Sequence, residues 1–220
     1  CITFIILIIG ASAGVSRSLA ATDAPKVQTR LPSNSVAVSD DALSTFFNPA
    51  GLGASRGFNL YYLRTYHDAP SGDDSFFVSA ANTGFSMEFA NVDDDTGFTR
   101  YTLSSGSGIG NSLYWGTGYS WMGSDDADYD KFKSWSLGLM LRRRYLSLGA
   151  IGRDLNRPRL RGERLGRTYD FGIALRPSTS RITLSVDARK VEDVPGLDFS
   201  YALELRPVNG ITLRGTLNED

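Results

Sequence analysis

The sequence is poor in the residues that most often carry catalysis and metal binding. Its 220 residues include one cysteine, Cys1, and one histidine, His67. A single cysteine excludes an internal disulfide and a cysteine-ligated metal site. His67 stands beside Asp68, but a Ser-His-Asp set also needs a nucleophile elbow, which the sequence does not offer. We therefore expect no catalytic residue, no metal site, no cofactor and no enzymatic activity.

The chain also lacks strong charge and long hydrophobic runs. Its formal net charge is -1, which gives no electrostatic reason to expect a nucleic acid as partner. The longest apolar stretch, residues 2–15, is too short for a spanning helix and is interrupted by Gly10 and Gly14. A secretory signal peptide over residues 1–20 fits this stretch better, with Ser18-Leu19-Ala20 as its cleavage site.

The start of the chain is unusual for a signal peptide. No basic residue precedes the apolar core, so we expect that the n-region is missing. A lipid-modified cysteine follows its apolar segment, whereas Cys1 precedes it, and we interpret Cys1 as part of the signal core. The mature chain then has no cysteine, which is consistent with an oxidising compartment outside the cytoplasm.

Four segments of about ten residues alternate strictly between apolar and polar side chains. The apolar sets are Trp135, Leu137, Leu139 and Leu141; Tyr169, Phe171, Ile173 and Leu175; Ile182, Leu184, Val186 and Ala188; and Phe199, Tyr201, Leu203 and Leu205. A period of two places each set on one face of a strand. An apolar face with aromatic ends, opposite a face of glycine, serine and charge, is typical of a membrane barrel.

About eleven strands are expected, near residues 57–66, 75–81, 84–90, 97–105, 111–122, 132–142, 145–153, 167–176, 181–190, 198–206 and 210–217. The connections between them alternate in length. Longer polar loops are expected at 67–74, 91–96, 123–131, 154–166 and 191–197, and shorter turns at 82–83, 106–110, 143–144, 177–180 and 207–209. Long loops on one side and tight turns on the other are typical of outer-membrane barrels.

The predicted fold class is all-β: an antiparallel up-and-down transmembrane β-barrel with an irregular N-terminal hatch-like segment. We assign residues 1–20 to the signal peptide, 21–56 to the periplasmic or hatch segment and 57–220 to the barrel. Bacterial barrels normally have an even number of strands, and eleven leave an open edge that lipid does not tolerate. The chain stops at Asp220 without the terminal aromatic residue of this class. We therefore expect closing strands or a further domain beyond it.

Residues 39–53, with the sequence SDDALSTFFNPAGLG, resemble the start of FadL-like and PorV-like outer-membrane proteins. In that family a small-Asp-Asp-Ala stretch leads into an Asn-Pro-Ala motif just before the first strand. A plain turn into the first strand is the alternative interpretation. The resemblance implies that Asn48, Pro49, Ala50 and Gly51 belong to a hatch inside the barrel. In transport members hydrophobic ligands leave through the wall, and in PorV-like members the barrel serves protein secretion.

A second resemblance concerns the regions 48–53 and 135–177. They are similar to the barrel-type region that precedes the peptidase domain in some long SppA-like signal-peptide peptidases. This resemblance implies that any chemistry lies in a domain beyond Asp220.

Seven charged residues are predicted to share the polar face of the strands: Arg142, Asp170, Arg176, Asp187, Arg189, Glu204 and Arg206. In a barrel they line or plug the lumen as compensating pairs, whereas on a soluble sheet they form the wet face. The aromatic load of the opposite face favours lipid, as in the segment with Leu113, Trp115, Tyr119 and Trp121.

Two loops carry concentrated charge. The longest contains Arg157, Arg159, Arg161 and Arg164, flanked by Arg153 and Arg167, with only Asp154 and Glu163 against them. If this loop lies outside the cell, its guanidinium groups suit the phosphates of lipopolysaccharide or an acidic substrate; a solvated loop with local salt bridges is the alternative. Asp126, Asp128 and Asp130 have the spacing of calcium ligands but lack the turn glycine and distal glutamate, which favours a solvated loop.

The leading functional hypothesis is a non-enzymatic channel or transporter for small hydrophobic molecules in the bacterial outer membrane. The second is a structural or secretion-associated barrel, including the membrane module of a SppA-like peptidase. The first predicts an apolar ligand pocket under the hatch, and the second predicts a lumen plugged by charge. A soluble periplasmic β-sandwich is the third class, and it requires the apolar face to be buried. Expected partners are outer-membrane lipid and either a hydrophobic small molecule or a secretion partner.

Overall fold

The computed structural model describes residues 34–65, 73–93, 96–124, 129, 131–177, 181–208 and 213–218. The protein is all-β apart from two short helices, α1 (Ser44–Phe47) and η1 (Pro49–Gly53). One sheet contains β1 (Asn59–Thr65), β2 (Asp73–Ala80), β3 (Thr83–Asp93), β4 (Thr96–Ile109), β5 (Leu113–Gly123), β6 (Lys133–Arg142), β7 (Leu146–Arg153), β10 (Thr168–Leu175), β11 (Ile182–Val191), β12 (Asp198–Leu205) and β13 (Leu213–Asn218). A separate hairpin contains β8 (Arg159–Leu160) and β9 (Glu163–Arg164). The signal-peptide assignment lies outside the described residues.

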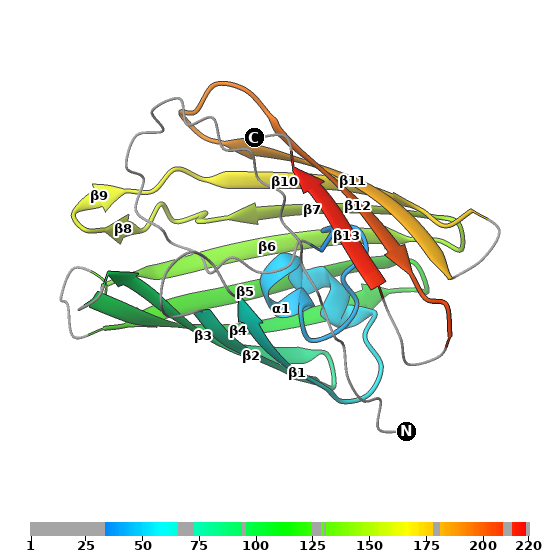
Figure 1. Ribbon diagram of the computed structural model, residues 1–220, viewed down its shortest axis with the longest axis horizontal. Coiled ribbons are helices and arrows are strands. Elements are labelled where there is room, and N and C mark those ends of the chain that lie inside the picture. The colour runs from blue at the N-terminus through cyan, green and yellow to red at the C-terminus, as the bar shows by residue number, and fades with distance from the viewer. Residues whose placement is uncertain are drawn as a thin grey trace.

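The sheet is antiparallel and up-and-down, with its eleven strands in chain order (Figure 1). The sequence-based expectation of eleven hairpin-connected strands is therefore confirmed. The expected alternation of longer and shorter connections holds in the middle of the sheet, where residues 124–132 and 154–167 are long and residues 110–112 and 143–145 are short. It is wrong elsewhere, because only residues 94–95 separate β3 from β4, and the connection over residues 206–212 is longer than that over 192–197. The turn expected at 106–110 is wrong in part, because β4 continues to Ile109 and Gly106 still pairs with Gly116. The chain reverses only at Gly110, where a positive φ of 65° suits glycine.

The sheet curves around the N-terminal segment but is open along one side (Figure 1). Within the described residues, β1 pairs only with β2 and β13 only with β12. The described strands thus form an open, curved sheet, and the closed barrel that the sequence predicts is not formed by them. Eleven alternating strands leave β1 and β13 running in the same direction, so these two edges do not match the antiparallel ladder of the rest.

The two faces of the sheet have opposite chemistry. On the convex face, twelve large apolar side chains are between 39% and 55% exposed: Leu103, Trp115, Trp135, Leu137, Leu139, Leu148, Phe171, Ile173, Leu175, Leu184, Tyr201 and Leu203. On the concave face, small polar and charged side chains are buried, among them Ser104, Ser120, Ser134, Ser147, Asp170, Thr183, Ser185 and Glu204. The two-residue period predicted these faces, and the apolar one points outward.

The concave side is filled by the plug, which we define as residues 34–56. Its side chains Ala37, Ala42, Ala50 and Leu52 have no exposed surface. A small cluster of Leu43, Phe47, Leu63 and Phe77, together with Ala42, joins the plug to β1 and β2.

Neither described helix has the length and apolarity that crossing a bilayer requires.

Candidate functional site

The candidate site is the contact between the plug and the concave face of the sheet. The structure places Asn48, Pro49, Ala50 and Gly51 there, all buried, with η1 in contact with β4, β5 and β6. These are the residues that the family resemblance assigned to a hatch. Asn48 is the N-cap of η1, which begins at Pro49 because proline is well suited to the first helical position.

A track of glycines forms the seat of the plug on the sheet. Gly106, Gly116 and Gly138 are cross-strand neighbours on β4, β5 and β6, and Gly149 pairs with Gly172 on β7 and β10. A Cβ atom added at Gly116 would lie 2.4 Å from the carbonyl of Pro49, and one added at Gly149 would lie 2.2 Å from the carbonyl oxygen of Val36. The backbone of the plug therefore lies directly against the wall, which only glycine permits.

Asn48 fixes the plug on this track. Its side-chain nitrogen donates to the carbonyl of Val36 at 2.8 Å and to the carbonyl of Leu139 on β6 at 3.1 Å. Its side-chain oxygen accepts from the backbone N–H of Ala50 at 3.1 Å and so caps η1. One buried amide thus joins two parts of the plug to the wall, and the space that it needs is left by Gly138.

The two aspartates of the plug reach opposite parts of the sheet. Asp40 forms an ion pair with Arg142 at the end of β6. Asp41 accepts a hydrogen bond from the hydroxyl of Tyr61 on β1 at 3.1 Å. Burial raises the pKa of the Asp41 carboxyl, and the positive charge of Arg214 on β13 opposes this shift. Asp41 therefore binds one edge strand of the sheet, β1, and interacts electrostatically with a positive charge on the other edge strand, β13.

A buried arginine holds the end of α1. Arg153 on β7 forms an ion pair with Asp170 on β10, which also accepts from Arg189 at 2.8 Å. The same guanidinium donates to the carbonyl of Phe47 at 2.8 Å and lies 5.9 Å from the ring centroid of Phe46. Because charged donors make stronger hydrogen bonds than neutral ones, Arg153 links the plug firmly to β7 and β10.

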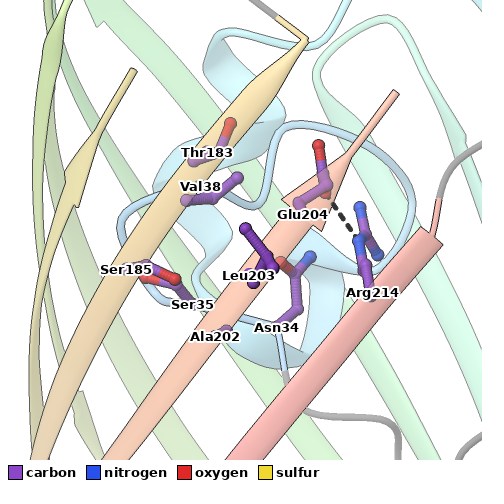
Figure 2. Close-up of a pocket in the computed structure, with 9 residues that line it drawn as sticks. All are labelled: Asn34, Ser35, Val38, Thr183, Ser185, Ala202, Leu203, Glu204 and Arg214. Atoms are coloured by element: carbon purple, nitrogen blue, oxygen red, sulfur yellow. Dashed lines mark hydrogen bonds and ion pairs between the residues drawn. The ribbon is translucent and has the colours of Figure 1, made fainter. Parts of the chain in front are cut away.

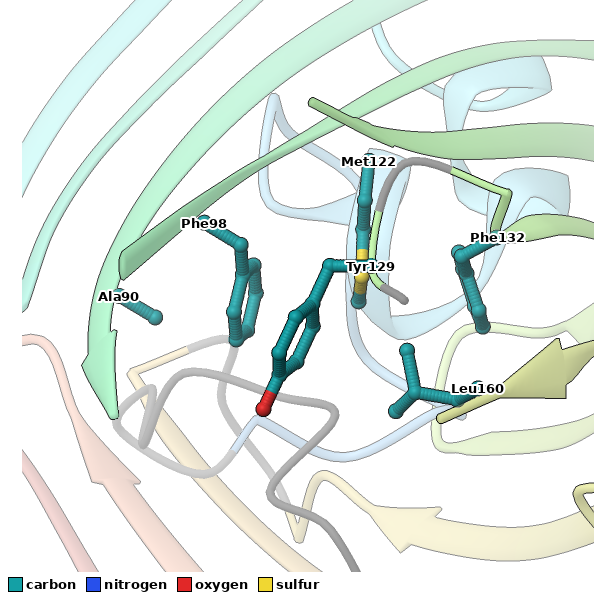
Figure 3. Close-up of a cluster of buried hydrophobic side chains, with 6 residues drawn as sticks. All are labelled: Ala90, Phe98, Met122, Tyr129, Phe132 and Leu160. Carbon is teal, nitrogen blue, oxygen red and sulfur yellow. The ribbon is translucent and has the colours of Figure 1, made fainter. Parts of the chain in front are cut away.

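A second arginine connects the plug to a buried cluster near the ends of β3, β4 and β5. The guanidinium carbon of Arg100 on β4 lies 5.8 Å from the ring centroid of Phe46 and 5.7 Å from that of Phe132. Phe132 belongs to a buried cluster with Ala90, Phe98, Met122, Tyr129 and Leu160 (Figure 3). This cluster, which we call the cap, gathers side chains of β3, β4 and β5 with those of the long loops. Arg100 thus contacts both the plug, through Phe46, and the cap, through Phe132.

The space left between the plug and β11 to β13 is the size of about one water molecule. It has a volume of about 10 Å³ and is lined by Asn34, Ser35, Val38, Thr183, Ser185, Ala202, Leu203, Glu204 and Arg214 (Figure 2). Arg214 and Glu204 pair across it at 2.6 Å. Within the described part of the chain the side-chain nitrogen of Asn34 has no hydrogen-bond partner, so a bound water suits this space.

The structure brings the predicted lumen charges into contact with partners of several kinds. Arg189 pairs with Asp170, and Arg206 pairs with Glu204 at 2.8 Å. Arg142 binds Asp40 of the plug. The last two use hydroxyl groups, since Arg176 donates to Ser147 at 2.7 Å and Asp187 accepts from Ser35 of the plug at 2.9 Å.

The predicted set omits three inward-facing arginines, Arg100, Arg153 and Arg214. Arg153 was grouped with the arginines of the long loop, although the strand expected at 145–153 ends at this residue, and the structure places it in β7. Continuing the period of Ser147 and Gly149 by two further steps places Arg153 on the concave face, so the signal was present. Nothing in the sequence pattern alone indicates that Arg153 binds the plug.

Other predicted features are distributed differently. His67, Asp126, Asp128 and Asp130 lie outside the described residues. Among the residues that are described, no three His, Cys, Asp or Glu side chains gather as metal ligands would. The loop arginines Arg157, Arg159, Arg161 and Arg164 are all exposed, in or beside the hairpin of β8 and β9.

The plug site thus consists of backbone contacts, hydrogen bonds and ion pairs that hold one segment of the chain against the rest. Such an arrangement suits mechanical closure of an interior. No family model matches this sequence, and no curated protein and no solved structure matches it either.

Proposed function

We propose that this chain forms the lipid-facing wall of a non-enzymatic bacterial outer-membrane β-barrel whose interior is filled by its own plug. The observation that carries the proposal is the outward direction of the large apolar side chains along the strands of the sheet. In water such a surface is unfavourable by roughly 25 cal/mol for each Å² exposed. Contiguous apolar surface of this extent indicates contact with a membrane or a partner, and it argues against a soluble β-sandwich.

Aromatic side chains at the two ends of the wall support a membrane setting. Near the long loops, consecutive ring contacts run from Tyr101 through Trp121 and Tyr119 to Trp135, with centroids 4.8–5.7 Å apart. Near the short turns, Phe58 and Tyr145 are exposed. Tryptophan and tyrosine favour the interface between lipid and water, and outer-membrane barrels carry them at both rims.

The filled interior supports the structural or secretion-associated role, of the PorV-like kind, more than an open channel. Between the plug and β11 to β13 the described residues leave a water-sized space, and ion pairs such as those of Arg153 with Asp170 and Arg214 with Glu204 occupy the concave face. The membrane module of a SppA-like peptidase belongs to the same class of role. In either case the barrel serves as a sealed platform in the membrane, and its loops and edges are what partners contact.

Transport of a small hydrophobic molecule is the second candidate, and one groove favours it. The outer face of β1, β2 and β3 has a hollow of about 470 Å³ lined by Tyr62, Asp74, Phe76 and Phe89. The hollow is shallow and open to the surroundings, and its three aromatic rings offer an apolar contact to a small ligand. Saturable binding of a fluorescent fatty acid that a Phe76→Ala variant loses would favour this candidate over the sealed platform.

The membrane proposal is tested with the tryptophans. All three, Trp115, Trp121 and Trp135, lie on the convex face. In the full chain refolded with phosphatidylcholine vesicles, we expect brominated lipid to quench their fluorescence and aqueous iodide to quench it little. Iodide quenching with no effect of brominated lipid would overturn the proposal, because the apolar face would then lie in water.

A further inference from the structure

The hairpin of β8 and β9 displays arginines that its own fold does not neutralise. Arg159 pairs directly with Arg164 across the two short strands, and Leu160 with Glu163. Arg161 and Gly162 form the two-residue turn, with φ of 52° and 82°, as tight hairpins of this type require. Like charges directly opposite each other on a strand pair are destabilising, so this arrangement calls for a counter-charge.

The hairpin is nevertheless held firmly in place. Leu160 is completely buried in the cap, and Pro158 is buried beside it. At the base of the hairpin Arg157 forms an ion pair with Glu192, whose carboxylate also accepts from the backbone N–H of Arg167 at 3.1 Å. The exposed arginines are therefore presented by an anchored element rather than by a free loop.

The loop arginines divide into two groups by their partners. Arg153, Arg157 and Arg167 have partners within the fold. Within the described part of the chain, Arg159, Arg161 and Arg164 form no ion pair, and the nearest acidic residue in sequence is Glu163. Three exposed guanidinium groups thus surround a hairpin tip with one carboxylate among them.

The position of the hairpin indicates which anion it meets. Leu155 and Asn156 continue the pairing of β7 with β6 at the level of Trp135, through bonds of 3.1 Å and 3.0 Å to its backbone. The hairpin follows directly and lies at the end of the sheet where β3 ends and β6 begins (Figure 1). If Trp135 marks the interface, the arginines lie at the depth of the lipid headgroups.

We propose that Arg159 and Arg164, with Arg161 at the tip, bind the phosphate monoester of a membrane lipid headgroup. This inference rests on the proposed membrane function. A planar guanidinium donates two parallel hydrogen bonds to phosphate oxygens, so two such groups on paired strands bind one phosphate together. The bound anion removes the repulsion between Arg159 and Arg164.

The test measures lipid preference around Trp135 by energy transfer. The full chain is refolded into phosphatidylcholine vesicles that contain pyrene-labelled phosphatidic acid or pyrene-labelled phosphatidylcholine. We expect phosphatidic acid to be enriched around the protein. The Arg159→Gln/Arg164→Gln variant is expected to reduce this enrichment by about thirtyfold, because each arginine near a membrane surface contributes a factor of slightly more than about five. Arg143→Gln/Arg144→Gln is the matched control, because it removes two exposed arginines from the turn between β6 and β7 at the opposite end.

Each other result has a defined meaning. An equal loss in the control variant would show a general charge effect and overturn the site. Abolition of the preference by inorganic phosphate would show that the site takes free phosphate rather than a headgroup. Normal quenching of the tryptophans by brominated lipid, with no preference for phosphatidic acid, would refute the headgroup site alone. Absence of that quenching would refute the membrane proposal and this inference together.

Discussion

The convex and concave faces of the sheet differ in how much each position matters. On the convex face, side chains such as Leu137 and Ile173 are interchangeable apolar groups that touch little of the protein. On the concave face, Gly116, Asn48 and Arg153 each make a contact that no other residue type reproduces. The specific contacts of the protein therefore lie on the concave side, while the surroundings determine the energy of the convex side.

The largest effect is expected on the concave face at Arg153. The Arg153→Met variant removes the buried partner of Asp170 and the donor to the carbonyl of Phe47. Removing one partner of a buried ion pair costs about 3–5 kcal/mol when the remaining charge is left unpaired, and because Arg189 still pairs with Asp170 we expect a loss at the lower end, about 3 kcal/mol. Urea unfolding in detergent measures the loss. Arg143→Met, at an exposed turn position, is the control, and an equal loss there would contradict the buried role of Arg153.

The convex face is tested by Leu137→Lys near the middle of β6. A lysine facing lipid costs up to about 2–4 kcal/mol, whereas the same change on a water-exposed face is nearly neutral. Leu197→Lys is the matched control, since Leu197 is as exposed as Leu137 but lies in the loop between β11 and β12. We expect the Leu137 variant alone to lose stability in vesicles. Equal behaviour of the two variants would place the convex face in water.

A smaller effect is expected at the glycine track. In Gly116→Ala the new methyl group meets the backbone of Pro49 and Ala50, at 2.4 Å and 2.6 Å, and backbone yields less easily than a side chain. We expect a loss of about 1–3 kcal/mol. Gly215→Ala on β13 makes the same change with no atom within 4 Å. Limited proteolysis of the plug measures the effect. If the Gly116→Ala variant were cleaved no faster than the original protein, the plug backbone would not lie directly against Gly116.

The smallest effect concerns the loops, which belong to neither face. The hydrogen bond from Arg157 lowers the pKa of the Glu192 carboxyl, and the backbone N–H of Arg167 adds to this. A lowered pKa in the folded state stabilises the protein above the unfolded pKa of about 4.3, and this contribution is lost as the pH falls through the folded value. A carboxyl titration by NMR is expected to show a higher Glu192 pKa in Arg157→Gln. An unchanged pKa would contradict the pair.

The sequence predicted the strands and their faces well because both depend on a local period of two. Leu137, Leu139 and Leu141 alternate with Ser136, Gly138, Met140 and Arg142, and this pattern requires no knowledge of distant contacts. The sequence did not predict the hairpin of β8 and β9, since a loop with several arginines and Pro158 has the composition of a solvated connection. Its strands form because Leu160 is buried in the cap, which is a tertiary effect.

The sequence singled out part of the plug, and its contacts were not predicted. The residues Asn48 to Gly51 stood out through a family resemblance, and the structure gives them a buried position against the sheet. That Asn48 binds the carbonyl of Leu139, 91 residues away, depends on the register of β6 and on the gap at Gly138. Neither follows from a local pattern, so contacts of this kind were outside the reach of the sequence.

The glycine track also determines how the plug is attached to the wall. A wall with side chains interlocks with its neighbour, and separating the two requires each interdigitated group to withdraw. Along Gly106, Gly116 and Gly138 the wall carries no side chains, so η1 lies on it without interdigitation. Attachment is therefore concentrated at separate points: the polar contacts of Asn48, Arg142 and Arg153, and the apolar cluster of Leu43 and Phe47 with Leu63 and Phe77. Contact between the plug and the wall is thus discontinuous, and losing one of these points removes a contact that the glycine surface does not replace.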